Sequence, residues 1–144
     1  MGDLSAIVYV STATRLFGPA ELEDLLRRSR ARNIREGLTG LLLFADGSFM
    51  QHIEGPRDRL QSVWSSIRMD PMHHGIIELV NEPVEEREFA NWAMAFSPAT
   101  TQDLTELSGA AWTPPADTLS PPRPSGRELL QRFWMRQERS RGRP

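Results

Sequence analysis

The order of the apolar segments is the feature that most constrains how this chain can fold. Five short segments have the composition and alternation of β-strands, and two longer segments have the apolar stripe of an amphipathic helix. The expected strands cover residues 4–11, 38–45, 48–54, 76–80 and 91–96, and the expected helices begin at Gly18-Pro19 and Gly55-Pro56. Asp46-Gly47, between the second and third strands, is a strong hairpin signal. The order βαββαββ therefore predicts an α/β (α+β) fold, a ferredoxin-like sandwich with both helices on one face of the sheet.

The same order predicts which strands are neighbours. In the usual strand order of a ferredoxin-like sheet, 4-1-3-2, the first and third strands lie side by side at the centre. We expect these two strands to run parallel, so that Tyr9 and Gln51 lie on adjacent strands. The fifth strand has two possible places, beside the first strand or at an edge of the sheet.

Three polar residues fall where the pattern predicts an apolar, inward-facing side chain: Tyr9, Asn33 and Gln51. Tyr9 is typical of a core tyrosine bonded to a backbone carbonyl, and Asn33 is suited to capping the end of the first helix. Gln51 is harder to explain, because alternation places its amide between Phe49 and Ile53, where two donors and an acceptor need partners. Polar groups that converge on a buried pocket indicate a planar ligand with polar edges, and a flavin is the leading candidate.

Residues on the two expected helices extend this candidate site. The buried stripe of the first helix includes Leu25 and Ser29, and a serine would let a planar ring approach, although packing between helices is its more common use. Four charged or polar residues cluster at the end of the second helix: Arg68, Asp70, His73 and His74. They are suited to a ribityl or phosphate group, and equally to a solvated helix end.

The strands carry four further residues of interest. Trp92 and Met94 share one face of the fifth strand, where such residues are more often core filler than cofactor contacts. Alternation turns His52 and Glu54 away from Gln51, so they are expected to face the C-terminal helices or solvent. None of these four residues indicates a ligand by itself.

Missing residue types and motifs exclude several classes of function. The chain has no cysteine, which excludes disulfides, zinc-thiolate sites, iron–sulfur clusters and photochemistry through a cysteinyl-flavin adduct. The three histidines form no i, i+4 pair, so we expect no metal. No hydrolase or nucleotide-binding motif appears, and there is neither a signal peptide nor an apolar run of about 20 residues. We expect a cytoplasmic protein that is not an enzyme and does not associate with membranes.

The charges divide the chain into two unequal parts. Residues 1–121 hold ten arginines against seventeen acidic residues, whereas residues 122–144 hold seven arginines against two acidic residues. An acidic body argues against nucleic acid as a partner. The basic tail is suited to an acidic protein surface, to RNA or to its own domain.

The pattern of elements changes after residue 97. We predict a ligand-binding domain over residues 1–97 and an extension over residues 98–144, which contains a short helix, a proline-rich linker and an amphipathic helix at 126–139. The apolar stripe of this last helix could cover the second face of the sheet, form a dimer or dock a regulator. We therefore expect a homodimer or a higher oligomer.

Six short segments match one family pattern in order. They are Val8-Tyr9-Val10-Ser11, Ser29-Arg30-Ala31-Arg32-Asn33, Gly37-Leu38-Thr39-Gly40-Leu41-Leu42, Phe49-Met50-Gln51-His52-Ile53-Glu54-Gly55, Asp70-Pro71-Met72-His73-His74 and Arg87-Glu88-Phe89-Ala90-Asn91-Trp92-Ala93-Met94. Together, over roughly residues 3–97, they resemble the BLUF domain, a family of blue-light sensors that use FAD. Arg32 and Met72 depart from the pattern, since relatives often carry Asn or His at the first position and a basic residue at the second.

The resemblance implies non-covalent binding of FAD, with FMN possible, and a role for each matched residue. Tyr9 would be the photochemical tyrosine and Gln51 the switching glutamine. Asn33 would bond the pyrimidine edge of the flavin, and Met94 and Trp92 would relay the change from the fifth strand. Leu25, Ser29 and the cluster at the end of the second helix would complete the cofactor contacts.

The implied mechanism is a light-driven transfer of an electron and a proton from tyrosine to flavin, after which the glutamine amide rotates or tautomerises. An added hydrogen bond to the flavin C4 carbonyl would shift absorption to longer wavelength. Because a neutral hydrogen bond contributes only about 0.5–1.5 kcal/mol, the lit state should relax thermally. Its output would pass through the fifth strand to a separate signalling protein.

Two other interpretations stay open. A protein-interaction module on the same fold would lack light chemistry and would give a colourless preparation. A flavin-dependent redox enzyme would need access of a substrate to flavin N5. RNA binding of the RRM type is not supported, because the chain has no aromatic RNP motif.

Overall fold

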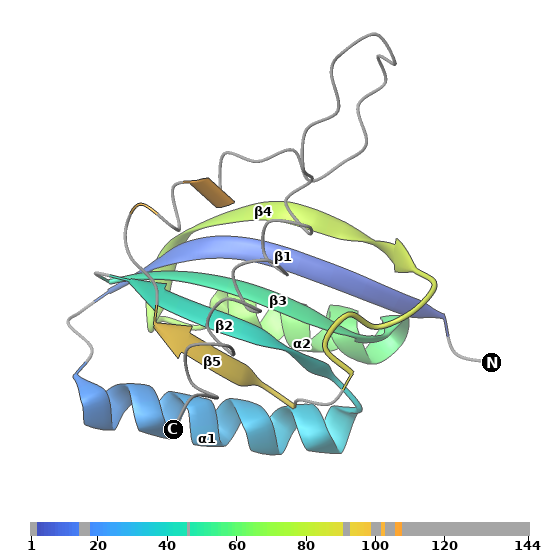
Figure 1. The fold of residues 1–144 in the computed structure, drawn as a ribbon, viewed down its shortest axis with the longest axis horizontal. Coiled ribbons are helices and arrows are strands. Elements are labelled where there is room, and N and C mark those ends of the chain that lie inside the picture. The colour runs from blue at the N-terminus through green and yellow to red at the C-terminus, as the bar shows by residue number, and fades with distance from the viewer. Residues whose placement is uncertain are drawn as a thin grey trace, which may run out of the picture.

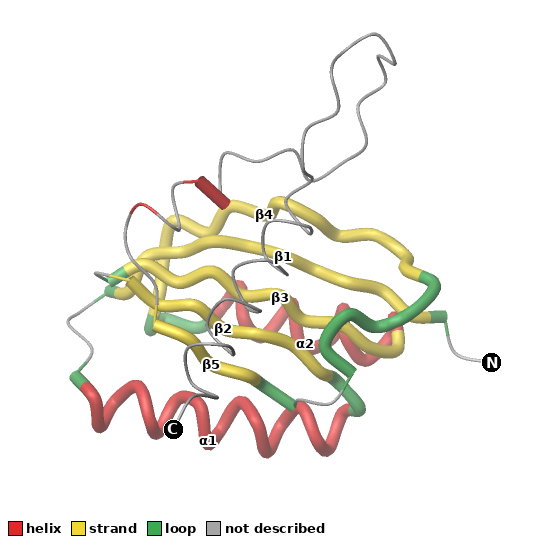
Figure 2. The backbone as a smooth tube through the Cα atoms, in the orientation of Figure 1, coloured by secondary structure: helices red, strands yellow, loops and turns green. Residues whose placement is uncertain are grey.

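Two α-helices cover one face of a five-stranded sheet (Figure 1, Figure 2). The computed structural model describes residues 3–14, 18–45, 47–90 and 93–98, together with Gln102, Glu106 and Leu107. The elements are β1 (Leu4–Ala13), α1 (Pro19–Glu36), β2 (Thr39–Ala45), β3 (Ser48–Pro56), α2 (Arg57–Met69), β4 (His73–Val84) and β5 (Ala95–Pro98). The predicted order βαββαββ and the ferredoxin-like sandwich are confirmed.

The two ends of α1 follow from its terminal residues. Pro19 lies in the first turn, where the N–H that proline lacks would have no helical acceptor. Gly37 ends the helix in the left-handed conformation, with φ 71°, and the Leu38 N–H donates to the Asn33 carbonyl at 2.8 Å. The backbone of Asn33 thus completes the cap. Its side chain is not needed there, which removes the capping explanation for this buried amide.

The strand order is β4-β1-β3-β2-β5, so the first and third strands are central neighbours as predicted. The prediction that they run parallel is wrong, because β1 pairs with β3 antiparallel. The crossover through α1 makes β1 and β2 run in the same direction, and the hairpin reverses β3. A strand inserted between them must therefore oppose both.

The fifth strand lies at the edge of the sheet, where β5 pairs parallel with β2. It covers Ala95–Pro98 rather than the expected 91–96, and Trp92 lies outside the described residues. β4 is longer than expected and begins at His73. Most of the predicted C-terminal extension, including the helix at 126–139, also lies outside the described residues. None of the described helices is both long enough and apolar enough to cross a bilayer.

Alternation along β3 divides the core between the two faces of the sheet. Ile53 packs with Leu60 and Ile67 of α2, while Phe49 packs with Leu26 of α1, so both helices cover the face that carries Gln51. A separate cluster around Met50 fills the opposite face.

His52 and Glu54 lie on this opposite face, as alternation predicts. Of the two neighbours expected for them, solvent is excluded, and most of the C-terminal extension lies outside the described residues. Both side chains are at most 1% exposed. The connection between β4 and β5 covers them, as the contacts of Glu88 and Phe89 with Glu54 show.

Candidate functional site

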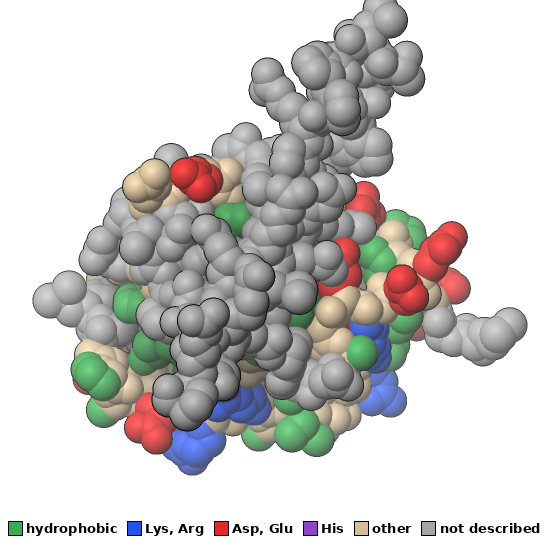
Figure 3. All heavy atoms as spheres, viewed as in Figure 1, with side chains coloured by type: hydrophobic (Ala, Val, Ile, Leu, Met, Phe, Trp, Pro, Cys, Tyr) green, Lys and Arg blue, Asp and Glu red, His purple; other side chains and the backbone are tan. Residues whose placement is uncertain are grey.

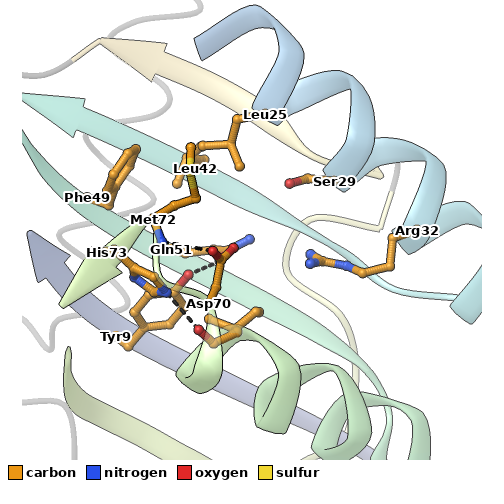
Figure 4. A pocket seen from close by; sticks show the side chains of 11 residues that line it. Tyr9, Leu25, Ser29, Arg32, Leu42, Phe49, Gln51, Asp70, Met72 and His73 are labelled. Atoms are coloured by element: carbon orange, nitrogen blue, oxygen red, sulfur yellow. Dashed lines mark hydrogen bonds between the residues drawn. The ribbon is translucent and has the colours of Figure 1, made fainter. Parts of the chain in front are cut away.

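Tyr9 and Gln51 form the centre of the candidate site. They lie directly opposite each other on β1 and β3, and both are about 95% buried, with exposed fractions of 5% and 4%. The Tyr9 hydroxyl donates a hydrogen bond to Gln51 Oε1 (Figure 4). The antiparallel register therefore brings together a phenol and an amide that are 42 residues apart in sequence.

The other end of the Gln51 amide points toward β5. Its Nε2 lies 3.7 Å from Met94 Sδ, a weak acceptor, and Met94 is 2% exposed. The amide thus has a strong hydrogen bond at its oxygen and a weak one at its nitrogen. The Tyr9–Gln51 pair has two donors, the Tyr9 hydroxyl and Gln51 Nε2. Of these, Nε2 has the weaker acceptor and could more easily donate to a ligand.

A cavity opens between α1 and α2 above this pair (Figure 4). Its lining combines apolar walls with polar side chains, and consists of Tyr9, Leu25, Ser29, Arg32, Leu42, Phe49, Gln51, Ile67, Asp70, Met72 and His73. Its volume is about 60 Å³, well below the roughly 300 Å³ at which ligand pockets begin. A tricyclic ring therefore enters only if side chains of the walls move aside.

The lining suits a flavin in its chemistry. Leu25, Leu42, Phe49 and Ile67 offer the apolar surface that a planar ring needs, while the Gln51 amide offers a donor to an edge of the ring. The cavity side chains therefore fit a planar heterocycle whose carbonyl groups accept hydrogen bonds.

His73 lines the cavity with both ring nitrogens already bonded. Nε2 lies 2.7 Å from the Ile67 carbonyl oxygen, and Nδ1 lies 2.8 Å from Ser11 Oγ. Because a carbonyl can only accept, Nε2 donates to Ile67, whereas the Ser11 hydroxyl can donate to Nδ1 or accept from it. The ring then serves the cavity as a fixed wall and ties the start of β4 to α2.

Asp70 is also positioned by the local backbone. Its Oδ1 accepts a hydrogen bond from the Met72 N–H at 2.9 Å, which closes the turn between α2 and β4. Arg68 and His74, predicted with it as one cluster, instead line an adjoining hollow beside Trp64, and His73 belongs to the lining of both. The Arg68 guanidinium lies over the Trp64 ring, 5.6 Å from its centroid.

Asn33 is fully buried but is not among the residues that line the cavity. Its Nδ2 donates to the Ala93 carbonyl oxygen at 2.6 Å, and its Oδ1 accepts from the Arg32 guanidinium at 3.1 and 3.2 Å. Figure 4 shows the Arg32 side chain extending from α1 toward the cavity. Both polar atoms of the Asn33 side chain therefore have partners within the protein.

Five lining residues were not predicted as site residues: Arg32, Leu42, Phe49, Ile67 and Met72. The sequence contained a signal for three of them. Phe49 shares a face with Gln51, Leu42 pairs with Gln51 across the hairpin, and Ile67 belongs to the apolar stripe of α2. No periodic pattern indicated Arg32 or Met72, which reach the cavity only because α1 and the turn after α2 meet there.

The Tyr9 phenol is held in its neutral form. Burial is the main cause that raises its pKa well above the ordinary value of 10.0; the Arg32 charge opposes this shift and the Asp70 charge adds to it. Neutral Tyr9 can donate to Gln51 at any physiological pH.

This shift predicts alkaline behaviour that can be measured. A phenol whose pKa is raised by folding stabilises the folded chain fully below the unfolded pKa, and this contribution is lost as the pH rises from about 10 toward the folded pKa. We expect Tyr9 to remain protonated beyond pH 10 while the free energy of unfolding falls. Tyr9 is the only tyrosine in the chain, so tyrosinate absorbance measured against a Tyr9→Phe blank reports it alone. Ionisation of Tyr9 at the ordinary pKa would contradict the inference that burial raises the pKa of this phenol.

Sequence comparison finds a matching family and several relatives. Residues 4–95 match the BLUF family, described as sensors of blue-light using FAD. Photoactivated adenylate cyclase subunit beta of Euglena longa is 33% identical over 118 residues, which cover 81% of this chain and 13% of that protein. The blue light- and temperature-regulated antirepressor BluF of Escherichia coli is 31% identical over 74 residues, which cover 51% of this chain and 18% of that protein. This chain therefore matches a small part of the length of these relatives.

Solved structures with the same fold include two of similar size. The dark-state structure of the BLUF protein BlrB is 36% identical, with a TM-score of 0.63, and the match covers 75% of this chain and 80% of that one. The ground-state structure of BlsA is 26% identical, with a TM-score of 0.65, and the match covers 71% and 69% of the two chains.

Proposed function

The chain belongs to the BLUF family of blue-light sensors that use FAD, and from this we propose that Tyr9 and Gln51 are its photochemical pair. One observation carries the proposal: the buried Tyr9 hydroxyl donates to the Gln51 amide oxygen at the floor of the cavity. A phenol can lose an electron readily only if its proton has an acceptor at hand. Here the amide oxygen is that acceptor.

The bound flavin supplies the oxidising power when it absorbs blue light. The chain supplies the route of the proton and the rearranged hydrogen bonds that persist afterwards. The electron of Tyr9 would pass to the flavin, and its proton would leave through Gln51 Oε1. The amide is held only weakly at Nε2 by Met94, so it could rotate or tautomerise before the electron and the proton return to Tyr9. The changed amide then offers a different set of donors to the edge of the ring, which shifts the absorption to longer wavelength.

The cofactor contacts in this proposal fall into two groups. Leu25, Ser29, Gln51, Asp70 and His73 line the cavity and suit the ring and the atoms next to it. Arg68, His74 and Asn33 lie outside this lining. Arg68 and His74 suit the charged or polar remainder of FAD, and Asn33 suits the pyrimidine edge of the ring once Arg32 releases its amide oxygen.

Met94 is the proposed first relay of the signal, with Trp92 as its companion in the sequence. Support for Met94 comes from its contact with Gln51 and from the hydrogen bond that its carbonyl oxygen accepts from Arg30 Nε at 2.9 Å. A change at the Gln51 amide would therefore move Met94, which directly precedes β5 and is bonded to α1 through Arg30. The role proposed for Trp92 is supported by the family resemblance alone.

The output is proposed to reach a separate signalling protein. The two relatives described above are named as a cyclase subunit and an antirepressor. The match covers only 13% and 18% of their lengths, so their activities need not lie in the matched region. We accordingly propose a photosensory domain at residues 1–97 without enzymatic activity, a C-terminal extension at 98–144 that meets the partner or a second copy, and a cytoplasmic location, which a cysteine-free chain suits.

A light-minus-dark absorption spectrum of the purified protein tests this function. We expect a yellow preparation whose flavin bands move to longer wavelength under blue light and return in darkness. A colourless preparation would favour the protein-interaction module instead. Bleaching by a reductant with turnover of a substrate would favour a redox enzyme.

A further inference from the structure

A buried carboxylate lies on the face of the sheet that is opposite the cavity. Glu54 is on β3, three residues after Gln51, and its side chain is 1% exposed. An ionised group at such a position needs several hydrogen bonds to balance the loss of water. The proposed photochemistry makes no use of this carboxylate, so its role needs a separate explanation.

Four donors surround the Glu54 carboxylate. Oε1 lies 3.0 Å from His52 Nε2 and 3.0 Å from the Glu88 N–H, while Oε2 lies 3.2 Å from Thr39 Oγ1 and 2.8 Å from the Phe89 N–H. Burial by itself would raise the pKa of Glu54, but the hydrogen bond and charge of His52 and the two backbone N–H groups together hold this pKa below its ordinary value. Only an ionised carboxylate accepts from all four donors.

Two of these donors belong to the crossover, which we define as residues 85–94 between β4 and β5. It joins β4 and β5, which lie at opposite edges of the sheet, and the structure describes it at residues 85–90, 93 and 94 (Figure 1). Arg87 reinforces the attachment, since its guanidinium donates to Thr39 Oγ1 at 3.0 Å and to the Gly37 carbonyl oxygen at 2.7 Å. Phe89 is 2% exposed, and its ring lies against His52 with centroids 5.0 Å apart. The first half of the crossover is therefore fixed to β2 and β3.

The second half of the crossover reaches the proposed photochemical pair. Four residues after Phe89, the Ala93 carbonyl accepts from Asn33, and the next residue is Met94, whose sulfur meets the Gln51 amide. β5 itself pairs with β2 at only four residues, from Ala95 to Pro98. A strand this short has little hydrogen bonding of its own to fix its position along the sheet.

We infer that Glu54 is a positioning residue, which holds the crossover from the opposite face of the sheet and thereby sets the place of Met94 beside Gln51. The inference rests on the proposed function only for the meaning of the contact between Met94 and Gln51. His52 follows Gln51 directly and donates to the same carboxylate. β3 thus contacts the crossover at Glu88 and Phe89 on one face of the sheet and at Met94 on the other.

Replacing Glu54 with glutamine tests the inference in the full-length, FAD-loaded protein kept in darkness. A carboxamide has one acceptor oxygen in place of two, so at least one of the Glu88 and Phe89 N–H groups loses its partner. We expect the N–H group that loses its partner to exchange its hydrogen at least about tenfold faster, while the backbone amides of α2 keep their exchange rates. We also expect the methyl resonance of Met94 to shift in a methionine-methyl NMR spectrum. The methyl of Met69, which is 84% exposed, serves as the internal reference.

Glu85→Gln is the matched control. Glu85 is exposed on the same crossover. Figure 3 shows acidic side chains on the part of the surface where β4 ends. This variant should leave both the exchange rates and the Met94 resonance unchanged. Unchanged exchange at Glu88 and Phe89 in Glu54→Gln would overturn the inference. So would faster exchange with an unmoved Met94 resonance, because Glu54 would then anchor the crossover without positioning Met94.

Thr39 provides a milder variant if Glu54→Gln does not fold. Thr39→Val removes the hydroxyl that donates to Glu54 and accepts from Arg87, whereas Thr39→Ser keeps it. We expect at least about threefold faster exchange at Phe89 and a Met94 shift in the valine variant alone. Equal behaviour of the two variants would overturn the inference.

The same samples separate this inference from the proposed function. A wild-type protein that shows no light-induced red shift would refute the proposed function, yet the exchange rates and the Met94 resonance would still measure the role of Glu54. An intact red shift together with unmoved resonances in Glu54→Gln would refute the positioning role alone.

Discussion

Replacing Tyr9 with phenylalanine is expected to abolish the light-induced red shift while flavin stays bound. The substitution removes the hydroxyl that donates to Gln51 Oε1 and keeps the ring, which packs 4.9 Å from the Trp64 ring between centroids. Without the phenol there is no proton for the amide to take and no event that reorients it. Light-minus-dark spectroscopy of the purified variant measures the loss, and the dark flavin spectrum measures retention of the cofactor.

The control for this variant changes the ring contact between Tyr9 and Trp64 and keeps the Tyr9 hydroxyl. Trp64→Phe alters the ring that packs against Tyr9 but leaves the phenol bonded to Gln51. It should retain a reversible red shift. A normal shift in Tyr9→Phe would refute the role assigned to the phenol, and no other tyrosine in the chain could substitute for it.

Gln51→Leu is the second change with a large expected effect. Leucine fills similar space but has neither donor nor acceptor, so light should leave no rearranged hydrogen bond and the red shift should be lost. The buried Tyr9 hydroxyl also loses its acceptor, which should cost about 1–3 kcal/mol of unfolding free energy. Chemical denaturation followed by circular dichroism measures this loss, alongside the light-minus-dark spectrum.

Gln61→Leu is the matched control for the amide. Gln61 lies on α2 and donates to Asn81 Oδ1 at 2.9 Å on the surface, away from the cavity. Its loss should change the unfolding free energy by less than about 0.5 kcal/mol and leave the red shift intact. If Gln51→Leu kept a wild-type red shift, the amide could not be the switch.

The local elements were readable from the sequence because they depend on short-range chemistry. Asp46-Gly47 indicated the hairpin, and Gly37 occurs where α1 ends in the left-handed conformation. Alternation placed Phe49, Gln51 and Ile53 on one face of β3, and their packing against the two helices confirms it. Even Tyr9 and Gln51 could be placed on neighbouring strands, since the order of elements restricts the sheet to few topologies.

Strand direction and long-range contacts were less accessible. The parallel pairing expected for β1 and β3 was wrong, although the connection through α1 and the hairpin together require an antiparallel pair. Arg32 could not be connected to Asn33 Oδ1 from spacing, because a long side chain can reach several neighbours on a helix. Arg68 and His74 were grouped with Asp70 by proximity in sequence, yet they line a different hollow.

The sequence by itself determined the element order, the face of each strand and the family, since these follow from periodic patterns and from motifs that survive as strings of letters. Only the tertiary structure decided that the Tyr9 hydroxyl meets the Gln51 oxygen, that Met94 meets its nitrogen, and that Glu54 holds the crossover from behind. These contacts join residues that are 34 to 43 positions apart in the sequence. They also depend on the positions of single atoms, which a periodic pattern cannot specify. Hydrogen bonds depend on distances of tenths of an ångström, which packing of the whole sheet fixes and no local pattern contains.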